Sequence, residues 1–180
     1  MTRERVPEFL QITGPGEMSP DLRREIIECW VTVSNAGGAA GFPFPPVGFD
    51  QVAEVADRII AGLSPQRSRF LLACADGRLA GWLNVRRDTN PLIRHWGTVH
   101  HVQTHTSFRG RGIGAALMHR LHRLAREEMG LEQLHLAARG GVGLEDFYGR
   151  LGWKEIGRWP GALRLDPGDD RDEILMVLEL

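Results

Sequence analysis

Residues 108–115 read Phe-Arg-Gly-Arg-Gly-Ile-Gly-Ala, and they lie between a predicted strand and the first turn of a long predicted helix. Glycine has no Cβ atom, so Gly110, Gly112 and Gly114 allow the chain to turn tightly and bring successive backbone N–H groups close to a bound group. The N-terminus of the helix adds about half a positive charge. The stretch therefore predicts an anion-binding loop that fits phosphate oxygens.

Two arginines in this loop can strengthen the binding of a phosphate. Arg109 and Arg111 each carry a guanidinium group that pairs with phosphate oxygens, although a solvated surface arginine accounts equally well for either position. The loop residues that we expect to bind a cofactor are Arg109, Gly110, Arg111, Gly112, Ile113, Gly114 and Ala115.

The same loop also satisfies the G-x-G-x-x-G/A pattern of dinucleotide-binding folds, through Gly110, Gly112 and Ala115. Such a fold places this turn after its first strand, whereas several strands are predicted before the turn here. The strand that follows, about 20 residues on, ends in Arg139 without an acidic residue that could bind a ribose. A dinucleotide binder is therefore the least favoured reading.

Hydrophobic periodicity and turn signals predict the elements around the loop. Before it we expect a strand over 6–12, helices over 20–35 and 50–62, and strands over 70–75, 79–85 and 98–104. After it we expect a helix over 112–129, a strand over 134–138, a helix over 144–151, and strands over 153–159 and 173–180 joined by an acidic loop over 160–171. This order predicts one mixed α/β (α+β) domain over residues 1–180 around a central sheet.

Composition narrows the range of partners. The 180 residues carry a formal net charge of -1 and form no long basic run, which argues against a general nucleic-acid binder. No apolar stretch approaches the roughly 20 residues of a membrane span, so neither secretion nor a membrane is expected. The two cysteines, Cys29 and Cys74, lack metal or redox spacing, which favours a reduced, cytoplasmic protein without a metal site. A small-molecule partner is the remaining expectation.

The strand before the loop breaks the alternation of a regular strand. Val99 and Val102 are three residues apart, whereas residues on one face of a strand are separated by an even interval. A β-bulge at His100-His101 restores the phase, and bulges leave backbone groups unpaired beside active sites. A loosely patterned edge strand without a bulge is the alternative.

Two motifs resemble the GNAT-type N-acetyltransferases. Residues 109–114, Arg-x-x-Gly-x-Gly, are similar to the family's Q/R-x-x-G-x-G/A segment, and residues 147–153, Phe-Tyr-x-x-Leu-Gly-Trp, are similar to its F-Y-x-x-L-G-F segment. The resemblance covers most of the chain. Within the family it is nearest to the tabtoxin-resistance type, which shares a glycine-rich loop like residues 37–42 and an L-H-L strand like residues 134–136.

The resemblance implies a mostly antiparallel mixed sheet, splayed between its fourth and fifth strands and flanked by helices. It implies that acetyl-CoA, the acetyl donor, binds at this opening with its pyrophosphate on the loop and its pantetheine along Val102, Gln103 and Thr104 as an extra strand. The expected reaction is direct attack by a small-molecule primary amine through a tetrahedral intermediate. A free N–H at the bulge would stabilise the oxyanion.

Acetyl transfer requires a neutral amine, and an alkylammonium titrates near pH ~10. His100 and His101 lie beside the predicted bulge, and imidazole titrates near pH ~6.5, so either can take the proton directly or through water. Arylalkylamine acetyltransferases of the family carry a histidine at the position of His100. Strand alternation predicts that only one of the two reaches the substrate. For His105, nearer the loop, a structural role is favoured.

The departing thiolate needs a proton donor, and Tyr148, the only tyrosine, can supply one from its hydroxyl. The alternative is a core ring with a hydrogen-bonded hydroxyl. Ala137 stands where the tabtoxin-resistance type carries an acid, so the base is a histidine, water or an acid of residues 166–172.

The acceptor site is the least constrained part of the prediction. Phe42 and Phe44, in the Gly- and Pro-rich segment 37–49, could wall an aromatic acceptor. Acetylation of a protein terminus or lysine, and a non-catalytic acyl-CoA-binding or sensing module, remain alternatives; the missing acid at Ala137 supports the second. A homodimer is common for this family.

Overall fold

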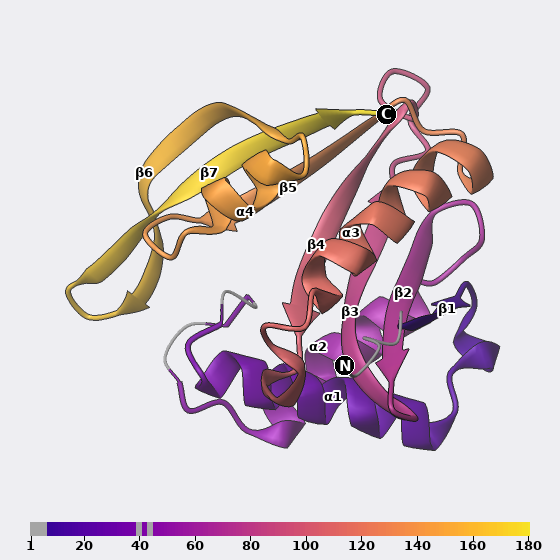
Figure 1. The fold of residues 1–180 in the computed structure, drawn as a ribbon, viewed down its shortest axis with the longest axis horizontal. Coiled ribbons are helices and arrows are strands. Elements are labelled where there is room, and N and C mark those ends of the chain that lie inside the picture. The colour runs from indigo at the N-terminus through magenta and orange to yellow at the C-terminus, as the bar shows by residue number, and fades with distance from the viewer. Residues whose placement is uncertain (1–6, 39–40, 43–44) are drawn as a thin grey trace, which may run out of the picture.

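The computed structural model of the chain describes residues 7–38, 41–42 and 45–180. It contains a seven-stranded sheet in the order β1-β2-β3-β4-β5-β7-β6, with helices on both faces (Figure 1). Every neighbouring pair of strands is antiparallel except β4 and β5, which are parallel. The prediction of a mixed, mostly antiparallel sheet flanked by helices is confirmed.

One face of the sheet is covered by α1 (Pro20–Asn35) and α2 (Phe49–Ala61). The helix α1 begins where predicted, because the Ser19 hydroxyl accepts a hydrogen bond of 3.2 Å from the Leu22 N–H and a proline occupies the first turn. Three- and four-residue spacing places its apolar side chains on one face, where Ile26, Ile27 and Trp30 are fully buried. They pack against the first strands of the sheet.

The first half of the sheet is formed by β1 (Glu8–Ile12), β2 (Ser68–Ala75), β3 (Arg78–Arg87) and β4 (Trp96–Thr104). Asp76 and Gly77 join β2 and β3 with positive φ angles of 53° and 71°, as a two-residue hairpin requires. The helix α3 (Ile113–Arg123) lies across the opposite face and continues as a π-helical turn, η3 (Leu124–Glu128), that stops before Gly130. None of the described helices is long and apolar enough to cross a membrane.

The second half of the sheet contains β5 (Gln133–Arg139), β6 (Lys154–Asp166) and β7 (Asp169–Glu179), with α4 (Leu144–Arg150) between β5 and β6. The prediction of a loop over 160–171 is wrong, because β6 and β7 continue as a hairpin to a turn at residues 167–168. Cross-strand pairing of Arg164 with Asp170 at 2.7 Å stabilises this extension. Pro160 and Gly161 are accommodated at a register shift on the edge strand β6.

The two halves of the sheet separate between β4 and β5. Pairing is confined to Trp96 with Gln133, Gly97 with Leu134 and Thr98 with His135. Beyond these residues the strands diverge toward their C-terminal ends, as Figure 1 shows. The predicted splay between the fourth and fifth strands is confirmed, and it leaves one edge of β4 without a strand neighbour.

Candidate active site

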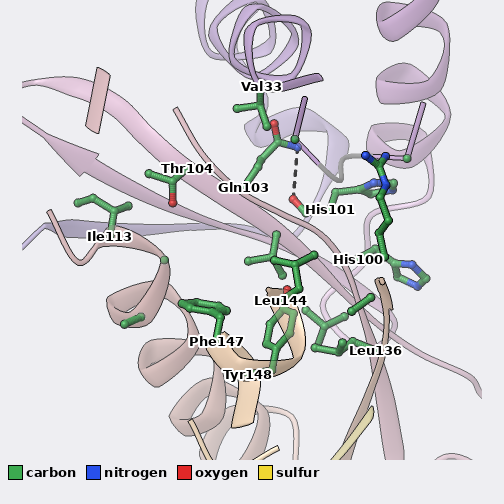
Figure 2. Close-up of a pocket in the computed structure, with 18 of the residues that line it drawn as sticks. Val33, His100, His101, Gln103, Thr104, Ile113, Leu136, Leu144, Phe147 and Tyr148 are labelled. Carbon is green, nitrogen blue, oxygen red and sulfur yellow. Dashed lines mark hydrogen bonds between the residues drawn. The ribbon is translucent and has the colours of Figure 1, made fainter. Parts of the chain in front are cut away.

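A cavity of 640 Å³ occupies the opening between β4 and β5. In Figure 2, Leu136 of β5 and Tyr148 of α4 face His100 and Thr104 of β4 across this opening. The cavity also reaches the glycine-rich loop and the first turn of α3. The predicted site residues that line it are His100, His101, Val102, Gln103, Thr104, Arg109, Gly110, Gly112, Ile113, Gly114, Ala115 and Tyr148.

The predicted β-bulge is present in β4. In the register of β3 with β4, Trp82 pairs with Gln103 and Asn84 pairs with His100. The two partners in β3 are two residues apart, whereas those in β4 are three residues apart, so β4 contains one extra residue. His101 takes up this residue with a φ angle of 57°, in the left-handed region. The bulge turns two consecutive side chains to one side: the His100 and His101 rings lie 5.9 Å apart. The prediction that they face opposite ways is therefore wrong.

The two histidines have different surroundings. The His101 ring packs against Trp30 at 4.6 Å and Trp82 at 6.0 Å, under α1. His100 has no ring contact with a described residue other than His101. Burial, and then the positive charge of Arg86, lower the pKa of His100 to about 4. Burial, His100 and Arg86 lower the pKa of His101 to about 4 as well, so both rings are neutral at pH 7.

Gln103 contributes to the site through its backbone. Its side chain is buried and extends toward Val33 of α1 in Figure 2, away from the opening. The Gln103 Nε2 atom donates a hydrogen bond of 3.3 Å to the His101 carbonyl oxygen. This hydrogen bond links the Gln103 side chain to the backbone of the bulge, two residues earlier in the chain. The open edge of β4 near Val102 and Thr104 therefore offers main-chain groups to a ligand.

The glycine-rich loop has the geometry that its sequence predicts. Gly110 and Gly112 have φ angles of 76° and 73°, which favour glycine, and Gly112 caps α3 in the left-handed conformation. The first hydrogen bond of the helix runs from the Ala116 N–H to the Gly112 carbonyl at 2.9 Å. Among the described residues, no backbone acceptor pairs with the N–H groups of residues 110–115. These groups are available to a phosphate.

The structure separates the two arginines of the loop. The Arg111 guanidinium pairs with Asp76 at 3.0 Å and stacks over the Phe108 ring at 5.0 Å, and Arg111 does not line the cavity. Arg109 lines the cavity and has no ion pair with a described residue. His105 accepts a hydrogen bond of 3.2 Å from the Ser107 N–H, which is the structural role expected for it.

Tyr148 lies on α4 with its ring in the core. It packs against Phe147 at 5.0 Å and Trp153 at 6.0 Å and is 6% exposed. Its hydroxyl makes no hydrogen bond with another described residue, and the residue lines the cavity. Burial raises the pKa of this phenol, which keeps its proton in place at neutral pH.

The residues expected to bind the acceptor do not form a wall of the cavity. Phe42 packs edge-on against Trp30 at 5.2 Å and is absent from the cavity lining, and Phe44 lies outside the described residues. Asp170 is paired with Arg164 and Asp169 with Arg171. The sequence analysis missed Arg139 and Glu173, which do line the cavity. The feature that brings them together is the pairing of Arg139 in β5 with Glu173 in β7, and this pairing cannot be read from the sequence alone.

These features define a sheet that is split beside an anion-binding, amide-rich loop at a helix N-terminus. The family model described as the acetyltransferase (GNAT) family matches residues 21–153. The chain therefore belongs to the GNAT acetyltransferases, as its two motifs predicted. Acetyl-CoA as the acetyl donor follows from this membership, which confirms that prediction. No curated protein matches the sequence.

Solved structures support the fold. A GNAT-family acetyltransferase from Streptococcus pneumoniae superposes with a TM-score of 0.70 at 18% identity, covering 96% of this chain and 100% of that one. A structure provisionally described as a phosphinothricin N-acetyltransferase gives 0.75 at 19% identity, covering 96% and 99%. A provisionally described acetyltransferase from Salmonella typhimurium, solved with its cofactor acetyl-CoA, gives 0.71 at 18% identity, covering 98% and 95%.

Proposed function

We propose that the protein transfers an acetyl group from acetyl-CoA to a primary amine of a small molecule. The observation that carries the proposal is the convergence in one cavity of three features: unpaired amides at residues 110–115, the open edge of β4, and a lining that contains both a protonated phenol, Tyr148, and a neutral imidazole, His100. We also propose that the whole chain acts as one acetyltransferase domain. A cytoplasmic location and a homodimer stay predictions.

The donor is held mainly by main-chain groups. The N–H groups of residues 110–115 bind the diphosphate, and Arg109 adds a positive charge. The pantetheine extends along Val102, Gln103 and Thr104 and pairs with the open strand edge. This arrangement directs the thioester toward the bulge, where a backbone N–H of β4 can donate to the carbonyl oxygen as negative charge develops on it.

The acceptor is deprotonated on the side of His100. A low pKa makes this ring a weak base, but it is neutral and ready to accept a proton at pH 7. The burial and the nearby Arg86 charge that lower the pKa of His100 also disfavour an ammonium group beside it. The amine therefore reacts as a neutral nucleophile, and the proton leaves through His100 or a water in contact with it.

The chemical step forms a C–N bond and breaks a C–S bond. The amine lone pair attacks the thioester carbonyl carbon, and the carbonyl electrons move to oxygen. When the carbonyl re-forms, the C–S electrons leave with sulfur, which takes the proton of the Tyr148 hydroxyl. The new C–N bond makes the nitrogen acidic, so its remaining excess proton passes to His100 and then to solvent. The Tyr148 phenolate takes one proton back from solvent, which restores the phenol for the next turnover. The products are an N-acetylated amine and free coenzyme A.

Free thiol release from acetyl-CoA, measured across a panel of small primary amines with mass spectrometry of the products, tests this proposal. Amine-dependent thiol release together with an N-acetylated product is expected. One observation favours the acyl-CoA-sensing alternative: Ala137 lines the cavity, and the resemblance to the tabtoxin-resistance type implies an acid at this position. Tight acetyl-CoA binding without thiol release for any small amine, peptide terminus or lysine peptide would contradict the enzyme and support the sensor.

A further inference from the structure

The β5–β7 side of the cavity carries two charged groups that the proposed reaction does not use. Arg139 ends β5 and Glu173 lies in β7, and the two are direct partners in the strand register. Both line the cavity. Among the described residues that line the cavity, the only other charged side chain is Arg109, in the phosphate loop. The donor's diphosphate therefore accounts for Arg109 but leaves Arg139 and Glu173 facing the acceptor.

Arg139 is a partly buried cation whose nearest opposing charge, Asp169, is already paired with Arg171. It makes no ion pair with another described residue. The carboxylate of its neighbour Asp169 accepts hydrogen bonds from two guanidinium nitrogens of Arg171, Nε and Nη2, and the bond from Nη2 is 3.2 Å long. Burial and the adjacent Arg171 charge lower the pKa of Arg139, so removing this guanidinium from water is costly. A group in this state is stabilised by an anionic ligand that pairs with it in the cavity.

Glu173 is the complementary group. It makes no ion pair with a described residue, although Arg139 stands opposite it in the register. Its carboxylate attracts an ammonium group, the charge state in which a free amine reaches the protein at neutral pH. One anion-binding group and one ammonium-binding group on neighbouring strands match a ligand that carries both charges a short distance apart.

We propose that Arg139 and Glu173 recognise the acceptor, and that the acceptor is a small amine which also carries an oxyanion such as a carboxylate or phosphonate. Arg139 pairs with the oxyanion, and Glu173 receives the ammonium before it is deprotonated beside His100. This inference rests on the proposed acetyl transfer and specifies its substrate class. It also explains why Phe42 can pack away from the cavity: the acceptor is selected by charge.

Matched amine pairs that differ only in the oxyanion test the inference. Suitable pairs are L-phenylalanine with phenethylamine, L-methionine with 3-(methylthio)propylamine, and 3-aminopropylphosphonate with propylamine. Thiol release from acetyl-CoA is measured for each, and binding to the coenzyme A-loaded protein is measured by calorimetry. We expect kcat/KM and affinity to be about 10- to 100-fold higher for the anionic member of at least one pair, as for a charge-assisted hydrogen bond. The pair showing this preference identifies the oxyanion.

Variants assign the preference to its residues. Arg139→Met is expected to remove the preference while changing the uncharged amine by less than about threefold, and Arg139→Lys to restore part of it. Glu173→Gln is expected to weaken both members of a pair equally. Arg123→Met, an exposed arginine on α3, is the matched control and should change neither.

Two results would overturn the inference: equal or better use and binding of the uncharged member in every pair, or an undiminished preference in Arg139→Met. These differ from failure of the proposed function, in which no amine of any kind releases thiol. In that case calorimetry still decides the recognition claim, because the anionic members must bind the coenzyme A-loaded protein more tightly than their partners.

Discussion

The proposed donor end and the proposed acceptor end of the cavity are built in different ways. The donor end uses main-chain amides of one continuous segment, residues 110–115, whose conformation is set by positive φ angles at Gly110 and Gly112. The acceptor end uses side chains from β4, β5 and β7, which come together only through sheet pairing. An anion-binding site made of local backbone amides tolerates no negative charge in its loop, whereas a site made of distant side chains can change specificity by single substitutions.

The largest expected effect is at the donor end. Gly112→Asp places a carboxylate in the anion-binding loop, and like-charge repulsion should lower coenzyme A affinity by at least about 100-fold. Gly112→Asn is the matched control, because asparagine tolerates the left-handed conformation equally well without the charge. It should lose less than about tenfold by calorimetry. Equal losses in both variants would show that backbone strain, and not charge, governs the loop.

Between the two ends, Tyr148→Phe should lower kcat by about 100-fold, since it removes only the proton donor to sulfur. The KM for acetyl-CoA should stay within about twofold, because the ring and its packing against Trp153 remain. Steady-state thiol release measures both parameters. An unchanged kcat would show that Tyr148 does not donate the proton. A lowered melting temperature would show that the loss of kcat comes from disrupted packing and not from the missing hydroxyl.

A smaller effect separates the two arginines of the loop. Arg109→Met should weaken coenzyme A binding about fivefold, as expected for an exposed charge that contacts phosphate. Arg111→Met should change it by less than about twofold, because Arg111 is paired with Asp76 at 3.0 Å and lies outside the cavity. Calorimetry at low and high salt measures the difference. A larger loss in Arg111→Met would contradict the separation of roles.

The last expected effect is on stability and not on activity, and it concerns the buried His101 ring. The folded pKa of His101, about 4, lies below its ordinary value of 6.5, so the unfolded chain binds more protons between these values. Its stabilising contribution is complete above pH ~6.5 and is lost as the pH falls toward 4. His101→Asn keeps a residue suited to φ 57° and removes the titration.

Denaturant unfolding at pH 7.5 and pH 5 measures this contribution. The wild-type free energy of unfolding should fall between these pH values by on the order of 1–2 kcal/mol more than that of His101→Asn. Parallel changes in the two proteins would mean that His101 titrates normally and is not the packed, neutral ring that its contacts with Trp30 and Trp82 indicate.

The comparison of the two ends also explains which features the sequence predicts. The glycine-rich loop, the Asp76-Gly77 hairpin and the bulge in β4 each depend on a few adjacent residues, and all three are present. The β6–β7 hairpin was predicted too short, because the edge strand β6 accommodates Pro160 and Gly161 at a register shift and continues beyond them. Local alternation also misplaced His100 and His101, since a bulge alters the alternation that it interrupts.

The acceptor end was not predictable from local pattern. Arg139 and Glu173 are 34 positions apart, and neither belongs to a motif. Their juxtaposition depends on the register of β5 against β7. The position of Arg111 outside the cavity was not predictable for a related reason: its partner, Asp76, lies in a hairpin whose position relative to the loop is a property of the fold.

A crystal structure of the protein with coenzyme A bound would test whether the loop over residues 110–115 and the open edge of β4 form the donor site. We predict that the diphosphate lies within hydrogen-bond distance of the N–H groups of residues 110–115. We also predict that the pantetheine runs along the open edge of β4 and that the thiol lies beside the Tyr148 hydroxyl. Coenzyme A bound elsewhere, with those amides free of phosphate and the gap between β4 and β5 unfilled, would contradict these predictions.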